Sequence, residues 1–147
     1  MNLKANQYIR EVKATFSKNL ANKEKIYIKS ASDAYKLFND LTDSTQEKLI
    51  TLHLASDNSI LCFQIVSIET INTALVNPAD IMRTALLTGA TALIVLHNHP
   101  SGNTEPSPAD KEITEKIKQA CELFQINLFD HIIIGDGYYS FADHELL

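Results

Sequence analysis

The stretch ALIVLHNHPSGNTEPSPAD, residues 92–110, decides the fold of this chain. Its first five residues are apolar, and a short apolar run that leads into a loop rich in Pro and Gly is typical of a buried strand. Ser107 and Pro108 then favour the start of a helix, since serine is a common N-cap and proline fits the first helical turn. The stretch therefore predicts a buried strand, a loop and a helix in immediate succession.

Two histidines and one aspartate in this stretch form a candidate metal site. His97 and His99 end the predicted strand, and residues two apart on a strand point the same way. Asp110 falls in the first turn of the predicted helix, and the loop can bring it back to the histidines. Two imidazoles and one carboxylate suit zinc and leave a fourth position for water. The alternative that spacing leaves open is two solvent-facing histidines and a helix-capping charge.

The rest of the chain predicts further strands and helices around this stretch. Residues 48–55 and 60–67 are strand-like runs separated by Ser-Asp-Asn-Ser, which predicts a hairpin. One helix is expected from Pro78 to a stop at Gly89, and a shorter one from an N-cap at Ser32. Ser107 is expected to form a capping box with Asp110. Residues 126–134, 135–137 and 138–141 read as a strand, a tight turn and a return strand. This order predicts an α/β sandwich with a mixed sheet between helices.

Composition limits the class of protein. The chain has 147 residues, 45% hydrophobic and 21% charged, which is typical of one globular domain. Its apolar runs are far shorter than the roughly 20 residues of a membrane helix, so no membrane association is expected. The first residues do not resemble a secretory signal, so we expect a cytoplasmic protein. Cys62 and Cys121 lie in apolar patterns and are expected to be reduced.

Charge is unevenly distributed along the chain. Residues 1–25 carry six Lys and Arg against two Glu, a net +4, which leaves −9 for the rest of a chain whose net charge is −5. An acidic body argues against binding of nucleic acid, although the basic segment could be a weak nucleic-acid arm or simply a solvated face. Within it, Val12, Ala14 and Phe16 alternate with polar residues and predict an edge strand, followed by a linker. We therefore divide the chain into a basic segment, 1–25, and a domain, 26–147.

The string HNHPSGNTEPSPAD fits the pattern H-x-H-x7-S-x2-D and resembles the JAMM/MPN metalloprotease domain, in particular the RadC family. The likeness continues through NPADIMRTALLTGATALIVLHNHPSG and FDHIIIGDGYYSF and covers most of residues 26–145. It implies the MPN/JAB fold, a cytidine-deaminase-like three-layer sandwich with a mixed sheet flanked by helices. It also implies a short stand-alone form, without the helix-hairpin-helix domain that precedes longer RadC proteins.

The resemblance implies a role for each residue of the motif. His97, His99 and Asp110 would be zinc ligands, and Ser107 would be a catalytic donor near the zinc-bound water that helps to stabilise an oxyanion. The donor set alone does not distinguish zinc from iron or manganese.

The general base of the resembling peptidases is a glutamate on an earlier strand, and the match is incomplete there. The stretch ILCFQIVSIETIN, residues 60–72, should carry it, but Ile65 stands at or beside the position, next to Gln64. Neither residue can act as a base. Glu69 is the nearest carboxylate and our candidate base, with a surface carboxylate as the alternative.

Several other polar and aromatic residues have structural interpretations. We expect Asp130 and His131 to be a structural pair outside the metal site, His53 to lie on the outward face of its strand, and His144 to lie in a terminal tail. Aromatic residues after the last turn could line a substrate groove or pack within the hairpin. They are Tyr138, Tyr139 and Phe141.

These observations lead to one main functional hypothesis and two rivals. The first is a zinc-dependent metallopeptidase or isopeptidase that hydrolyses an amide bond with a zinc-activated water. Its polypeptide substrate could add as a strand to a sheet edge. The second is a catalytically silent zinc-binding scaffold that binds a protein partner, and the third is a DNA-repair or mobile-element accessory domain. The sequence does not give the oligomeric state.

Overall fold

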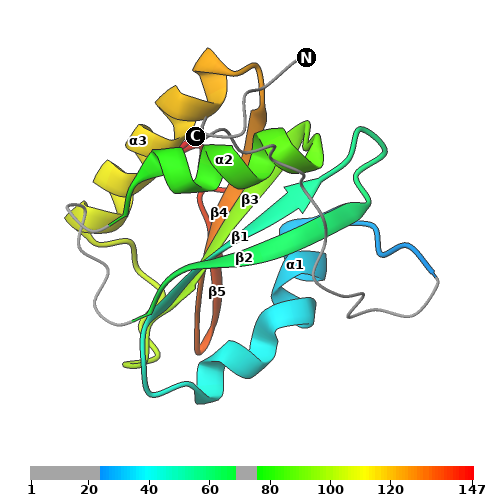
Figure 1. Cartoon of the computed structure of the whole chain (residues 1–147). Coiled ribbons are helices and arrows are strands. Elements are labelled where there is room, and N and C mark those ends of the chain that lie inside the picture. Colours follow the sequence, from blue (N-terminus) through cyan, green and yellow to red (C-terminus); the bar gives the residue numbers. More distant parts are fainter. Residues whose placement is uncertain (1–23, 69–75) are drawn as a thin grey trace, which may run out of the picture.

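One mixed sheet of five strands runs through the computed structural model, which describes residues 24–68 and 76–147 (Figure 1). The strands lie in the order β2-β1-β3-β4-β5, and only β3 and β4 are parallel neighbours. The strands are β1 (Lys48–Leu54), β2 (Ile60–Ile68), β3 (Ala92–Asn98), β4 (Asn127–Gly135) and β5 (Gly137–Ser140).

Helices cover both faces of this sheet (Figure 1). One core cluster joins the sheet to α2 (Pro78–Thr88) and α3 (Pro108–Leu123), and a second joins the opposite face to α1 (Ala31–Phe38) and the short 3-10 helix η1 (Asn39–Asp43). All seven residues of β3 are buried, as a central strand between two helical layers requires. The predicted three-layer α/β sandwich is therefore confirmed.

Helix starts follow the local sequence closely. The side chain of Asn77 caps α2, and Gly89 ends that helix with a left-handed φ of 70°. Ser107 caps α3 in the predicted capping box. The first helix begins earlier than predicted, because Ser30 rather than Ser32 accepts the hydrogen bond from the Asp33 N–H.

The prediction for His53 is wrong, because β1 is covered on both faces. Leu52 and Leu54, the two neighbours of His53 in the sequence, pack on the face of the sheet that α1 covers. Leu49 packs with α2 on the opposite face. His53 shares the face of Leu49 and is fully buried. The alternation of residues 48–55 indicated a strand with one solvent-facing side. In the structure α2 covers that side, so His53 and its neighbours in β1 are buried on both faces.

Two further sequence predictions concern the start of the chain and the cysteines. The predicted edge strand at residues 12–16 and most of the linker lie outside the described residues. Cys62 and Cys121 are both free thiols, as expected. In the described ranges, 24–68 and 76–147, no helix is long and apolar enough to cross a bilayer.

Candidate metal centre

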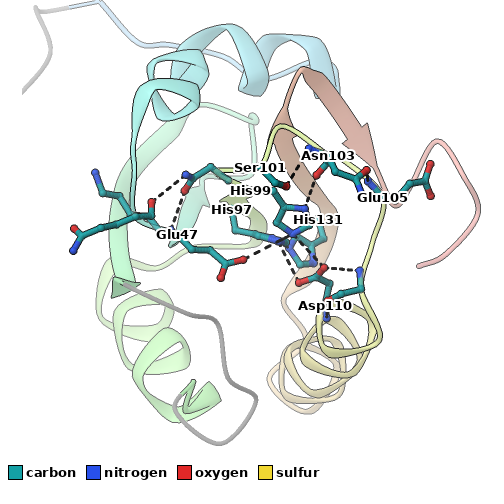
Figure 2. Close-up of polar contacts among 12 residues, drawn as sticks. Glu47, His97, His99, Ser101, Asn103, Glu105, Asp110 and His131 are labelled. Carbon is teal, nitrogen blue, oxygen red and sulfur yellow. Dashed lines mark hydrogen bonds and ion pairs between the residues drawn. The ribbon is translucent and has the colours of Figure 1, made fainter.

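The side chains of His97, His99 and Asp110 meet at the carboxyl end of β3 (Figure 2). The Nε2 atoms of the two histidines are 2.9 Å apart. Asp110 Oδ1 lies 3.2 Å from His97 Nε2, and Asp110 Oδ2 lies 3.4 Å from His99 Nε2. The structure therefore brings together all three residues of the predicted ligand set, and the alternative of solvent-facing histidines does not describe His97, which is fully buried.

These separations fit a tetrahedral cation. With metal–nitrogen and metal–oxygen bonds of about 2.0–2.1 Å, the edges of a tetrahedron around zinc are about 3.3 Å long. The His97–His99 separation is 2.9 Å, and each imidazole has a different oxygen of the Asp110 carboxylate at a comparable distance, Oδ1 at 3.2 Å from His97 and Oδ2 at 3.4 Å from His99. The donor set and its spacing thus suit zinc held by these three side chains, with one position left open.

The loop after β3 orients His99. Its Nδ1 lies 2.6 Å from the backbone carbonyl oxygen of Asn103, which can only accept a hydrogen bond, so Nδ1 carries a proton. In the neutral ring the lone pair is then on Nε2, which faces His97 and Asp110. The hydrogen bond with Asp110 raises the pKa of His99 against the opposing effect of burial. A cation at the centre would compete with that proton.

Asp110 is held as a carboxylate. Burial acts to raise its pKa, but hydrogen bonds and the charges of His97 and His99 outweigh burial, so the pKa lies well below its usual range. Asp110 Oδ2 also accepts the Ser107 N–H at 2.7 Å, while Ser107 Oγ accepts the Asp110 N–H at 3.1 Å. Helix capping and presentation of the carboxylate to the histidines are therefore performed by the same two residues.

Glu47, which our sequence analysis missed, is the fourth member of the centre (Figure 2). Its Oε1 lies 3.8 Å from His99 Nε2, and ligand atoms from Glu47, His97 and His99 all lie within 4.8 Å of one another. Glu47 immediately precedes β1, which is antiparallel to β3 with Leu49 opposite His97. The pairing of these two strands therefore brings Glu47 to the histidines.

The residue between the two histidines fixes the backbone around Glu47. Asn98 is buried, accepts the N–H of Lys48 at 2.9 Å through Oδ1, and donates through Nδ2 to the carbonyl of Gln46 at 3.1 Å. One side chain thus binds the peptide groups on both sides of Glu47.

Comparison with known proteins agrees with this fold. A family model described as the RadC-like JAB domain matches residues 28–146. The chain belongs to the RadC-like JAB domain family.

Relatives in this family carry uninformative names. A UPF0758 protein of Pelodictyon phaeoclathratiforme is 42% identical over 134 residues, which cover 90% of this chain and 59% of that protein. UPF0758 proteins of Aquifex aeolicus and Methanosarcina mazei are 37% identical over 126 residues and 41% over 113 residues, covering 85% and 76% of this chain and 54% and 49% of theirs. The chain spans about half to three fifths of the length of these relatives.

The two residues that our sequence analysis placed at the position of a peptidase general base lie away from the histidines. Gln64 and Ile65 are on the edge strand β2, opposite Thr51 and Ile50 of β1, and Ile65 is 48% exposed. Neither residue contacts His97, His99 or Asp110 in any described interaction. Glu69 lies outside the described residues. Alternation along 60–72 could not have found Glu47, because the decisive signal is the pairing of β1 with β3.

Asp130 is structural, as expected, but His131 is not confined to that pair. The Asp130 carboxylate accepts hydrogen bonds from Ser140 Oγ at 2.6 Å and from the N–H groups of His131 and Ala142, which ties β4 to β5 and to the chain after it. The His131 ring instead points at His97, with His131 Nε2 2.7 Å from His97 Nδ1. His131 therefore contacts one residue of the candidate metal centre, His97, directly.

The aromatic residues of the last hairpin pack against one another and against neighbouring elements. Tyr138 packs on Tyr35 of α1, and Tyr139 stacks on His144, whose Nδ1 is 2.8 Å from the Ser140 carbonyl. Phe141 is buried against His131. These contacts favour hairpin packing over a substrate groove.

Proposed function

We propose that this RadC-like domain is a zinc-dependent amide hydrolase of the JAMM type. The observation that carries the proposal is the convergence of two histidine Nε2 atoms and two carboxylates, Asp110 within 3.4 Å and Glu47 within 3.8 Å of the imidazoles. His97, His99 and Asp110 would hold the ion. Such an ion supplies Lewis-acid chemistry, lowering the pKa of a water molecule and polarising a carbonyl group.

Glu47 is suited to move the proton in this reaction. It is the most exposed carboxylate of the centre, with a side chain 19% exposed against 3% for Asp110, so water and substrate can reach it. At 3.8 Å from His99 Nε2, Oε1 is in reach of a water molecule bound between them. It would accept the proton of that water and return it to the leaving amine.

Ser107 can assist if its hydroxyl proton is free to donate. Its Oγ already accepts from the Asp110 N–H, but accepting does not use the hydroxyl hydrogen. Placed at the edge of the centre by the capping box, it would stabilise negative charge that develops on a substrate oxygen.

A polypeptide is the substrate class that fits the open sheet edge. β2 is the outer strand, and its last residue, Ile68, is paired with Lys48, next to Glu47. An extended segment that adds along β2 would approach the centre with its backbone. Among the described residues, the segment 26–28 bonds to the beginning of this edge, at Ser59 and Ile60, which is the end of β2 opposite to Ile68.

Metal content is the first test. Protein purified without chelator or metal-affinity resin is analysed by elemental mass spectrometry beside a His97→Ala, His99→Ala double variant. We expect about one zinc per chain, lost in the double variant. Saturating zinc should also stabilise the wild type, by about 2.7 kcal/mol at a hundred times Kd. No metal in either protein would overturn the proposal.

A second test separates an enzyme from a silent scaffold. A peptide library is incubated with zinc-loaded wild type, Glu47→Gln and Glu69→Gln. We expect Glu47→Gln to keep zinc and lose cleavage by at least a hundredfold, and Glu69→Gln to keep both. If only Glu69→Gln loses cleavage, the general base is Glu69, as the sequence analysis proposed, and not Glu47. The scaffold hypothesis rested on a missing glutamate, which Glu47 would supply in the proposed function.

A further inference from the structure

We propose that His131 is a positioning residue that fixes the tautomer of His97 and thereby turns the His97 Nε2 lone pair toward the metal centre. Thr114 fixes His131 in turn. The inference rests on the proposed metal site, since His97 is one of its ligands.

Three short hydrogen bonds connect these groups in series, and Figure 2 shows the two histidines side by side. His97 Nδ1 is 2.7 Å from His131 Nε2, and His131 Nδ1 is 2.6 Å from Thr114 Oγ1. Thr114 Oγ1 is 2.6 Å from the backbone carbonyl oxygen of Asp110. The two histidines are fully buried and Thr114 is 3% exposed, so solvent does not offer alternative partners.

The last acceptor determines the direction of the whole series. A backbone carbonyl only accepts, so Thr114 donates its single hydroxyl proton to Asp110 and must accept from His131 Nδ1–H. An imidazole that is protonated at Nδ1 alone bears its lone pair on Nε2, which in His131 is the atom 2.7 Å from His97 Nδ1. That lone pair accepts His97 Nδ1–H. With Nδ1–H donated to His131, His97 Nε2 is left for the centre: it faces Asp110 Oδ1 at 3.2 Å and would present its lone pair to a bound cation.

Packing holds the His131 ring in this orientation. Phe141 stacks on it with ring centroids 4.7 Å apart and an interplanar angle of 16°. The series joins β3, β4 and α3, and its ends are the side chain of one proposed ligand, His97, and the backbone of another, Asp110. Groups that orient a ligating histidine through its other nitrogen typically contribute 10- to 100-fold to metal affinity.

Four variants of the series test this inference. His131→Phe keeps a ring on Phe141 and removes the acceptor for His97. His131→Gln places an amide oxygen near the former Nε2 and restores an acceptor. Thr114→Val removes the hydroxyl without a change of shape, and Thr114→Ser returns it.

A matched control comes from the other fully buried histidine of the sheet. His53 on β1 has a threonine neighbour, with Thr51 Oγ1 3.0 Å from its Nε2, but has no described contact with the centre. His53→Phe therefore measures what the loss of a buried histidine does by itself.

Two readouts are used, zinc affinity by chelator competition and the tautomer of His97 by long-range proton–nitrogen NMR on metal-free protein near pH 8. We expect His131→Phe and Thr114→Val to weaken zinc binding 10- to 100-fold and to lose the Nδ1–H signal of His97. His131→Gln, Thr114→Ser and His53→Phe should stay within about threefold of wild type.

A purely structural role would give a different pattern. If His131→Phe and Thr114→Val lower the melting temperature as His53→Phe does, but leave zinc affinity and the His97 tautomer unchanged, the inference is wrong. If the wild type binds no zinc, the proposed function fails. The NMR comparison on metal-free protein then still decides whether His131 sets the His97 tautomer.

Discussion

Ser107 and Asp110 hold each other by two reciprocal hydrogen bonds, Asp110 N–H to Ser107 Oγ at 3.1 Å and Ser107 N–H to Asp110 Oδ2 at 2.7 Å. The same carboxylate faces His97 and His99. Ser107 caps α3, and in the proposed function it would also donate to the substrate, so substitutions can test whether it has both roles.

Ser107→Ala should lower the free energy of unfolding by about 1 kcal/mol, whereas Ser107→Gly should lower it by only a few tenths, because glycine is a tolerated N-cap. Both variants lack the hydroxyl. If Ser107 donates to the substrate, both should lose peptide cleavage to a similar extent, and urea titrations should separate them. If peptide cleavage is lost in Ser107→Ala but kept in the more stable Ser107→Gly, then Ser107 only caps the helix and does not donate to the substrate.

The sequence predicted most of the motif because the relevant signals are local. Strand alternation placed His97 and His99 on one side, and the Ser-Pro start of α3 placed Asp110 in its first turn, so a few neighbouring residues contained the information. Glu47 could not be found in this way. Its place depends on the antiparallel pairing of β1 with β3, which joins segments about 50 residues apart and leaves no periodic trace.

Burial was misjudged for the same reason. Alternation along β1 indicated one polar face, but α2 packs on it and buries His53 and Thr51. Whether a strand is half-covered or fully covered depends on where a distant helix docks. His131 was likewise taken for a structural residue because its partners, His97 and Thr114, lie on other elements.

Asn98→Ala should separate metal binding from Glu47-dependent turnover. It removes the partner of a part-buried backbone N–H at Lys48, which should cost about 1 kcal/mol of stability. Zinc should still bind, since none of the proposed ligands is changed, but peptide cleavage should fall as Glu47 loses its anchor. Amide exchange at Lys48 should become faster, which can be measured without a substrate.

Asn77→Ala is the control for this variant. It removes the cap of α2, a helix that carries none of the proposed ligands, at a similar expected cost of about 1 kcal/mol. Equal effects of the two variants on cleavage would mean that stability alone, and not the position of Glu47, explains the loss.

Gly135→Ala should displace the loop that orients His99. A Cβ at Gly135 would lie 2.3 Å from the Gly102 carbonyl oxygen, which is backbone and accepts the Asp136 N–H at 2.8 Å. We expect a loss of about 1–3 kcal/mol of stability and weaker zinc binding, measured by chelator competition.

Gly89→Ala is the control for this variant. Its strain comes from the backbone φ of 70°, and no atom lies within 4 Å of the added Cβ, so it should reduce stability by about 1 kcal/mol and leave zinc affinity unchanged. Equal zinc affinities in the two variants would contradict a role of this contact in orienting His99.

His53 should make the stability of the domain depend on pH. Burial lowers its pKa from 6.5 to about 4, and no described polar atom partners its Nδ1. The unfolded chain therefore binds a proton near pH 6.5 that the folded domain resists until about pH 4. The resulting stability is fully present above pH 6.5 and is lost as pH falls from there to about 4, by up to about 3 kcal/mol.

The variant His53→Leu removes this titration. The free energies of unfolding of wild type and variant are measured by urea titration at pH 7.5, 6, 5 and 4. The difference between them should shift in favour of the variant as pH falls. Since carboxylates and the other histidines titrate in both proteins, their contributions cancel in that difference. A difference that is constant across the four pH values would mean that His53 is protonated as readily in the folded domain as in the unfolded chain.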